Sequence, residues 1–312
     1  MIIINLILFL IFFFVLIKSS QYAIRYSSRL SKTFRVSEFI FSFFIIAIIS
    51  AFPETTISII SAIRGVPEFG LGTLLGSNVA DLTLVFGIVA LVSAKGISVK
   101  NQILKKDLFC LALLLLPLIM GLNGHFSRLE GILLVLAGLL FFFTLFIESK
   151  MFKKKLKMLK GNSVFKNSAL LILSLAVLLL SSNYTVKYAV DFANDIKIPA
   201  VLIGLTIISI GVCLPELIFS IRAIKSKHNG LAFGDILGTV IIDATIVIGI
   251  IAIIKPFSFN PVIIYVTGLA MFLGGLLTFL FSRSGNVLSK REGIYLLLFY
   301  ALYLIIEILV LS

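Results

Sequence analysis

Charged residues are scarce in this sequence. Only 13% of its 312 residues are Asp, Glu, Lys or Arg, while 60% are hydrophobic. A soluble domain carries about 25% charged residues. A helix needs ~20 apolar residues to cross a bilayer, and the sequence has room for about ten such segments. Regular turn signals argue against a barrel, whose strands would be ~10 residues long and alternate in polarity. The composition therefore predicts an all-α membrane protein that crosses the bilayer many times.

Cysteine and histidine are also scarce. The two cysteines, Cys110 and Cys213, lie in apolar runs, and the sequence has no CxxC motif. The two histidines, His125 and His228, lie far apart in predicted loops. This pattern excludes a disulfide framework and argues against a zinc or iron–sulfur site. We therefore expect no resident cofactor.

Ten hydrophobic segments are predicted to span the membrane. Within a few residues they are 1–17, 38–63, 70–94, 107–122, 130–148, 167–182, 199–221, 231–254, 260–282 and 293–311. The first lacks a basic amino-terminal region and a small-residue cleavage site, so we interpret it as a retained span rather than a signal peptide. It can also continue beyond Lys18 as a longer, tilted helix. Ten spans place both termini on the same side of the membrane.

The basic residues predict which side that is. Of the 27 Lys and Arg residues, 22 fall in the loops that follow odd-numbered spans. Loops rich in Lys and Arg stay in the cytoplasm, so we expect the Lys-rich loop 149–166 inside and both termini outside, most simply in the plasma membrane. Because the basic residues fall in short loops between spans, membrane orientation explains the net charge of +13 better than nucleic-acid binding does.

A pattern that occurs twice divides the chain. Pro53-Glu54, followed by a run from Gly76 to Asp81, returns 162 positions later as Pro215-Glu216 and a run from Gly238 to Asp243. The predicted units are a first half at 1–148 with its repeat at about 38–94, a linker at 149–166, and a second half at 167–312 with its repeat at about 199–254. Because each half has five spans, the second enters the membrane upside down, as in inverted-repeat transporters. The predicted fold is two inverted five-helix repeats with broken helices at the midplane.

The repeated pattern places four acidic residues inside predicted spans: Glu54, Asp81, Glu216 and Asp243. A charged carboxylate at the bilayer centre costs roughly 2.5 kcal/mol or more, so its presence indicates a function. A hydrogen bond between helices is the weaker explanation for the two aspartates. No Lys or Arg lies mid-span near the glutamates to neutralise them. We therefore predict that the four acids meet near the membrane midplane and bind a cation.

Further residues of the two halves share a helical face with these acids. They are Ala47, Ser50 and Ser77 in the first half and Ser209, Val212 and Thr239 in the second. Pro53 and Pro215 lack a backbone N–H, so each is expected to kink its helix. The carbonyl groups that the kinks would free are those of Ile49 and Gly211. A site built only from oxygen ligands suits calcium better than a soft metal.

The predicted cluster would also bind protons. Four carboxylates in one dry site cannot all remain ionised without a cation, because they repel one another and lose their hydration. Protons would then be shared by the cluster rather than held by single residues, and they compete with metal ions for it.

Two further acids, Glu148 and Glu307, lie near the ends of spans and are expected at the membrane interface.

The two repeats resemble the alpha repeats of the sodium/calcium exchanger family, within the calcium/cation antiporter superfamily. The family pattern is approximately G-T-S-x-P-E followed by G-S-N-x-x-(N/D) in each half. The resemblance implies that Glu54 and Glu216 are the main calcium ligands and that Asp81 and Asp243 flank a central position. The implied carbonyl ligands are at Ser50 and Val212, and the implied sodium positions are Ser77, Thr239 and the carbonyl groups of Ala47 and Ser209.

The sequence departs from the family pattern at two places. Ile49-Ser50-Ala51 and Gly211-Val212-Cys213 stand where the family has Gly-Thr-Ser. Carbonyl ligation survives such changes, because every residue has a carbonyl group. The hydroxyl groups expected at Ala51 and Cys213 are absent, which leaves the coupling ion open. Acids at both Asp81 and Asp243 add negative charge and favour an extra cation such as potassium or a proton.

The function that the resemblance implies is secondary active antiport rather than enzyme catalysis. Calcium would be exported in exchange for sodium by alternating access, with spans 1 and 6 moving against spans 2, 3, 7 and 8. Proton-coupled or potassium-dependent antiport is the alternative. A cation channel, which needs an open pore and usually oligomeric symmetry, and an intramembrane enzyme with paired carboxylates are the rivals from other classes. The expected partners are inorganic cations and the lipid bilayer, without nucleic acid, and the expected transport unit is a single chain.

Overall fold

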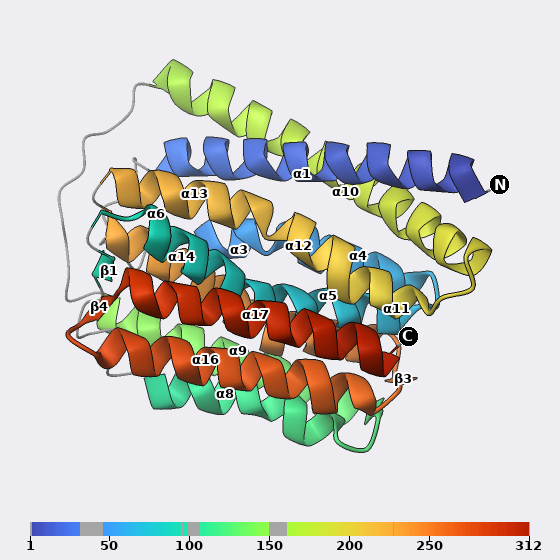
Figure 1. Ribbon diagram of the computed structural model, residues 1–312. Coiled ribbons are helices and arrows are strands. Elements are labelled where there is room, and N and C mark those ends of the chain that lie inside the picture. Colours follow the sequence, from blue (N-terminus) through green and yellow to red (C-terminus); the bar gives the residue numbers. More distant parts are fainter. Residues whose placement is uncertain are drawn as a thin grey trace.

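The computed structural model describes residues 2–31, 46–94, 96–98, 107–149, 161–226 and 228–311. These residues form a bundle of roughly aligned helices, with both marked chain ends at the same end of the bundle (Figure 1). Eight described helices are long and apolar enough to cross a membrane, and two shorter apolar helices cover Phe52–Ile63 and Asp107–Gly121. The prediction of a helical, multi-pass membrane protein is confirmed. The ten-span layout and the inversion of the halves stay predictions, and residues 38–45 lie outside the described residues.

The helices follow the predicted spans closely. The first half contains α1 (Ile2–Ser31), α3 (Ala47–Ser50), α4 (Phe52–Ile63), α5 (Pro67–Ala80), the π-helical turn η2 (Asp81–Val85), α6 (Phe86–Val92), α8 (Asp107–Gly121) and α9 (Arg128–Ser149). The second half contains α10 (Gly161–Asp195), α11 (Ala200–Ile203), η3 (Gly204–Ile208), α12 (Ser209–Val212), α13 (Leu214–Lys225), α14 (Asn229–Ile241), η4 (Ile242–Val247), α15 (Ile248–Ile254), η5 (Ile264–Gly268), α16 (Leu269–Arg283) and α17 (Lys290–Leu311).

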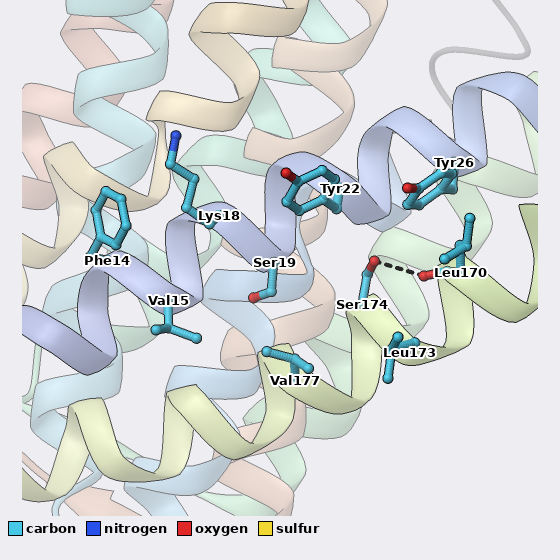
Figure 2. A pocket seen from close by; sticks show the side chains of 10 residues that line it. All are labelled: Phe14, Val15, Lys18, Ser19, Tyr22, Tyr26, Leu170, Leu173, Ser174 and Val177. Atoms are coloured by element: carbon cyan, nitrogen blue, oxygen red, sulfur yellow. Dashed lines mark hydrogen bonds between the residues drawn. The ribbon is translucent and has the colours of Figure 1, made fainter.

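The two longest helices, α1 and α10, have 30 and 35 residues and pack against each other along one side of the bundle (Figure 1). The predicted alternative that the first span continues beyond Lys18 as a longer helix is confirmed. The predicted span 167–182 was too short, because an α-helix satisfies its own backbone and can continue through polar residues. Lys18 lies in α1 with its amine 5.4 Å from the centre of the Phe14 ring. A groove of about 450 Å³ between α1 and α10 is lined by Lys18, Tyr22, Tyr26 and Ser174, among others (Figure 2).

Both helices that contain the Pro-Glu motif are interrupted. A turn at Ala51 separates α3 from α4, and Cys213 separates α12 from α13. The prolines stand at the starts of α4 and α13, where a missing N–H costs least. Backbone N–H groups at the ends of α3 and α12 bond to the carbonyl groups of Ile49 and Gly211. The interruptions confirm the predicted kinks, but the expectation that these two carbonyl groups are free was wrong.

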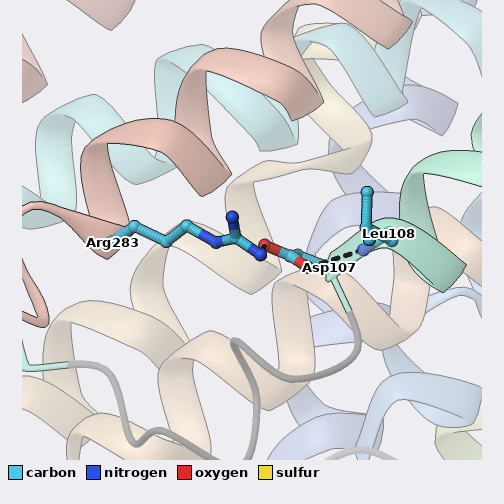
Figure 3. Close-up of polar contacts among 3 residues, drawn as sticks. All are labelled: Asp107, Leu108 and Arg283. Carbon is cyan, nitrogen blue, oxygen red and sulfur yellow. Dashed lines mark hydrogen bonds and ion pairs between the residues drawn. The ribbon is translucent and has the colours of Figure 1, made fainter.

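Short β-pairings tie the two halves together at both ends of the bundle. β1 (Ile97–Ser98) pairs with β4 (Val287–Leu288), and β2 (His125–Phe126) pairs with β3 (Phe257–Ser258), both antiparallel. Arg283, at the end of α16, forms an ion pair with Asp107, at the start of α8 (Figure 3). The first pairing joins two loops that were both predicted to be cytoplasmic, and the second joins two that were predicted outside.

Small residues let the helices of the two halves approach closely. A Cβ atom placed on Gly76 would lie 2.5 Å from the carbonyl oxygen of Leu205, and one on Gly72 would lie 2.7 Å from a methyl carbon of Val201. Glycine spaced in this way is typical of tight packing between membrane helices. This contact presses α5 of the first half against α11, η3 and α12 of the second.

Candidate functional site

The four predicted acids are all in the protein interior. Glu54 and Glu216 lie in the first turns of α4 and α13, immediately after the helix interruptions. Asp81 begins η2 and Asp243 is the second residue of η4, so each aspartate lies where an α-helix changes to a π-helical turn. Such turns frequently mark functional sites. All four side chains are 0% exposed, so none faces lipid.

These four acids share one electrostatic environment. Glu54 is repelled by Asp243 and Asp81, Glu216 by Glu54 and Asp81, and Asp243 by Asp81. None of their eight carboxylate oxygens has a hydrogen-bond partner among the described residues. A buried carboxylate without a partner is costly, so this group of side chains is suited to bind positive charge.

The carboxylates do not form a closed metal cage in this conformation. Among the described residues, no three His, Cys, Asp or Glu side chains are arranged closely enough to hold a metal ion. Three or more of the acids are therefore not placed for direct coordination of one ion in this conformation. Metal binding at all four acids would need the broken helices to close around the ion. Binding at fewer acids would use hydroxyl and carbonyl oxygens in place of the other carboxylates.

The remaining predicted ligands lie at contacts between the halves. The Thr239 hydroxyl is 3.5 Å from the carbonyl oxygen of Ala47, and the Cys213 thiol is 3.5 Å from the carbonyl oxygen of Ser77. These contacts connect each broken helix with the helix of the other half that bears an aspartate. The Ser77 hydroxyl itself donates to its own helix, at Leu74. Both hydroxyl-bearing residues are fully buried.

Three more predicted ligands lie beside the interruptions. Ser50 and Val212 are fully buried at the ends of α3 and α12. Ser209 is also buried, and its carbonyl group accepts a backbone bond from Cys213 at 3.4 Å. Ala47 accepts the equivalent bond from Ala51 at 2.9 Å. A carbonyl oxygen has two lone pairs, so these bonds leave capacity for an ion.

Asp235 is a fifth buried acid that the sequence analysis missed. It lies on α14, is 0% exposed, and accepts a hydrogen bond of 2.9 Å from the Ser50 hydroxyl. It also repels Glu54 and Glu216. The repeat hid it, because the matching position in the first half is Thr73. Its spacing of four residues before Thr239 and eight before Asp243 could have revealed it, since these positions share one helical face.

Glu307 was predicted near a span end at the membrane interface; its depth stays a prediction, but the structure buries it inside the protein. Its side chain is 0% exposed and lies within 2.8 Å of the Thr267 hydroxyl. The prediction counted residues from the end of the span, which does not tell which face of α17 packs inward. The side chain of Glu148 lies outside the described residues.

Comparisons with known proteins agree with this architecture. The family described as "Sodium/calcium exchanger protein" matches the chain over residues 4–147 and again over 166–309. The sodium/calcium exchanger MaX1 of Methanosarcina acetivorans is 26% identical, covering 98% of this chain and 99% of its own. The inner membrane protein YrbG of Escherichia coli is 28% identical over 75% of each chain.

Solved structures give the same result. The sodium-calcium exchanger NCX_Mj, soaked with 2.5 mM Na⁺ and 0.1 mM Ca²⁺, matches with a TM-score of 0.72 and 26% identity over 100% of both chains. Its structure soaked with 10 mM Na⁺ and 10 mM Sr²⁺ matches equally well, with a TM-score of 0.72. Together with the matches over nearly the whole sequence, these likenesses show that the chain belongs to the sodium/calcium exchanger family and is a cation antiporter of the membrane.

Proposed function

We propose that this antiporter exports calcium in exchange for sodium by alternating access. Glu54 and Glu216 bind calcium from opposite halves, with Asp81 and Asp243 at the flanks. Carbonyl groups at Ser50 and Val212 complete the calcium site, and the sodium positions are Ser77, Thr239 and the carbonyl groups of Ala47 and Ser209. The observation that carries the proposal is the burial of four acids whose eight carboxylate oxygens lack protein partners among the described residues.

The inverted ten-helix repeat is part of this proposal. The two stretches that match the family begin 162 residues apart, at 4 and 166, which is the offset of the Pro-Glu motifs. Asp81 and Asp243, related by the same offset, both lie at π-helical turns. An odd number of spans in each half then gives the two halves opposite orientations, with a shared site between them.

The proposed moving parts are α1 and α10. They pack against each other at the side of the bundle, and much of each helix faces outward. Phe13 of α1 touches the position of Gly211, where an added Cβ would clash with its ring. Movement of α1 along the bundle would therefore change the packing beside the interruption at Cys213, next to Glu216.

The orientation follows from charge. We propose that loop 149–166 is cytoplasmic, that both termini are outside, that the plasma membrane is the location, and that one chain is the transport unit. Lipids and inorganic cations are then its partners. Of the 27 basic residues, 22 lie between an odd-numbered predicted span and the next span, in segments assigned to the cytoplasm by the positive-inside rule, although some of them, such as Lys18, lie within helices in the structure.

Proton-coupled or potassium-dependent exchange is the second candidate, and a specific observation favours it. Ala51 and Cys213 carry no hydroxyl group at the helix interruptions, and Asp235 adds a further buried carboxylate beside Ser50. Fewer neutral oxygen donors and more negative charge suit a proton or an additional monovalent cation.

Flux measurements test both candidates. The purified protein would be placed in liposomes, and uptake of radiolabelled calcium would be driven by an outward gradient of sodium, potassium or protons in turn. We expect the sodium gradient to give the largest uptake. If uptake follows only the proton or the potassium gradient, that ion rather than sodium is the coupling ion. Calcium flux that is independent of every counter-ion would indicate a channel.

A further inference from the structure

Glu307 is a buried acid outside the group of four. It lies on α17, is fully buried, and both of its carboxylate oxygens are 2.8 Å from the Thr267 hydroxyl in the π-helical turn η5. A hydroxyl group has a single proton to donate. The ionised carboxylate would therefore have one donor shared between two oxygens, far less than a buried charge requires.

The elements packed against α17 supply no compensating cation among the described residues. These elements are α6, η2, α16 and η5. Their titratable residues are Asp81 in η2, Tyr265 in η5 and Arg283 in α16. Tyr265 is exposed and donates to the carbonyl of Leu122. Arg283 is paired with Asp107 where α16 ends, next to the start of α17 and away from Glu307.

Two tyrosines extend from Glu307 toward the four acids. Tyr300, Tyr303 and Glu307 have the spacing i, i+3, i+7, so they form one stripe of α17, about 10 Å long. Tyr300 is 4% exposed and Tyr303 is 3% exposed, and neither hydroxyl has a hydrogen-bond partner among the described residues. The two rings are 5.9 Å apart. Tyr303 interacts electrostatically with Glu307, and Tyr300 with Asp81.

We propose that Glu307 is a proton-binding site separate from the four acids, and that Tyr303 and Tyr300 connect it with Asp81. The carboxylate takes up one proton and becomes neutral, which removes the cost of a buried charge. Solvent water supplies the proton. The stripe thus runs from Glu307 toward the candidate cation site.

The connection has a consequence for transport, which rests on the proposed exchange function. A cation at Asp81 and a proton at Glu307 repel each other through the buried stripe. Binding of one therefore weakens binding of the other, and by linkage the effect is reciprocal. Calcium binding is then expected to release a proton from Glu307 in addition to any proton released by the four acids.

Infrared difference spectroscopy on the purified protein in lipid tests the site directly. The spectrum of the wild type minus that of Glu307→Gln is expected to contain the carbonyl band of a protonated carboxylic acid at neutral pH, and the band should disappear as the pH is raised. Glu292→Gln, in the first turn of the same helix, is the matched control. This variant keeps Glu307, so the spectrum of Glu292→Gln minus that of Glu307→Gln should still contain the band. A difference spectrum that contains only carboxylate bands at every pH would overturn the proposal.

A second variant keeps the test decisive if Glu307→Gln does not fold. Tyr303→Phe removes only the hydroxyl group and leaves the acid in place. The acid band should then shift in frequency and in the pH at which it disappears. An unchanged band would overturn the connection through the tyrosines.

Proton counting separates this proposal from the exchange function. Addition of calcium to the wild type should release more protons per calcium bound than addition to Glu307→Gln, and equal release would overturn the linkage. If the wild type shows no counter-ion-driven calcium flux, the exchange function fails while the infrared band still reports on Glu307. If flux is normal and the band is absent, the proton site fails alone.

Discussion

Ser50 and Asp235 are joined by a hydrogen bond of 2.9 Å that crosses from the first half of the chain to the second. Both residues are fully buried, and the other carboxylate oxygen of Asp235 has no partner among the described residues. The bond fixes the end of α3, where the proposed carbonyl ligand of Ser50 lies. It also brings a fifth carboxylate close to the four acids, so Asp235 both positions a ligand and adds negative charge.

Removal of this bond should destabilise the protein. Ser50→Ala leaves Asp235 buried without its donor, and a buried unsatisfied polar group costs about 1–3 kcal/mol. We expect a lower midpoint in thermal unfolding of the protein in detergent. Ser61→Ala is the matched control, because Ser61 is equally buried but its hydroxyl bonds only within its own helix, to Ile57. Equal losses in the two variants would contradict a special role for the Ser50–Asp235 bond.

The two glutamates should be essential for exchange. Glu54→Gln and Glu216→Gln keep the size of the side chain but remove one negative charge from a fully buried site. Changes outside the first coordination sphere already cost 10–100-fold in metal affinity, so we expect calcium exchange in liposomes to fall by more than about 100-fold. Glu68→Gln, on the exposed first turn of α5, should retain wild-type flux. Full activity in both buried variants would remove the site assignment.

Close packing at Gly76 should be indispensable to the contact between α5 and η3. Its Cβ would lie 2.5 Å from a backbone oxygen, which cannot move aside without shifting a helix. Gly76→Ala should therefore cost about 1–3 kcal/mol of stability, as over-packing generally does. At Gly268 the nearest neighbour is a leucine side chain at 3.1 Å, which can change its rotamer. Gly268→Ala should therefore be tolerated better, and the reverse order in unfolding measurements would refute the packing argument.

Restoring the missing hydroxyl groups should strengthen sodium binding. Ala51→Ser and Cys213→Ser place a donor and acceptor oxygen at each helix interruption. One additional favourable polar contact is worth about 1 kcal/mol, which corresponds to about a fivefold change in affinity. We expect the sodium concentration for half-maximal exchange to fall accordingly. Ala62→Ser, in the buried part of α4 away from the interruption, should leave it unchanged. An equal effect in all three variants would argue against sodium at these positions.

The sequence predicted the features that depend on local chemistry and on the repeat. Proline predicted the interruptions near Ala51 and Cys213, and hydropathy predicted most helices to within a few residues. Asp235 was not predicted as a site residue, because the matching position in the first half, Thr73, is not acidic. The burial of Glu307 within the protein was not predicted, because burial depends on which face of α17 packs inward and a hydropathy scan has no information about that face.

The β-pairings at the two ends of the bundle constrain how such a molecule can move. Each pairing joins a loop of the first half to a loop of the second half, one at each end of the helix bundle. Rocking the two halves apart would have to break these pairings. Neither α1 nor α10 is connected directly to a strand of these two β-pairings. The proposed movement of these two helices would therefore leave both pairings between the halves intact.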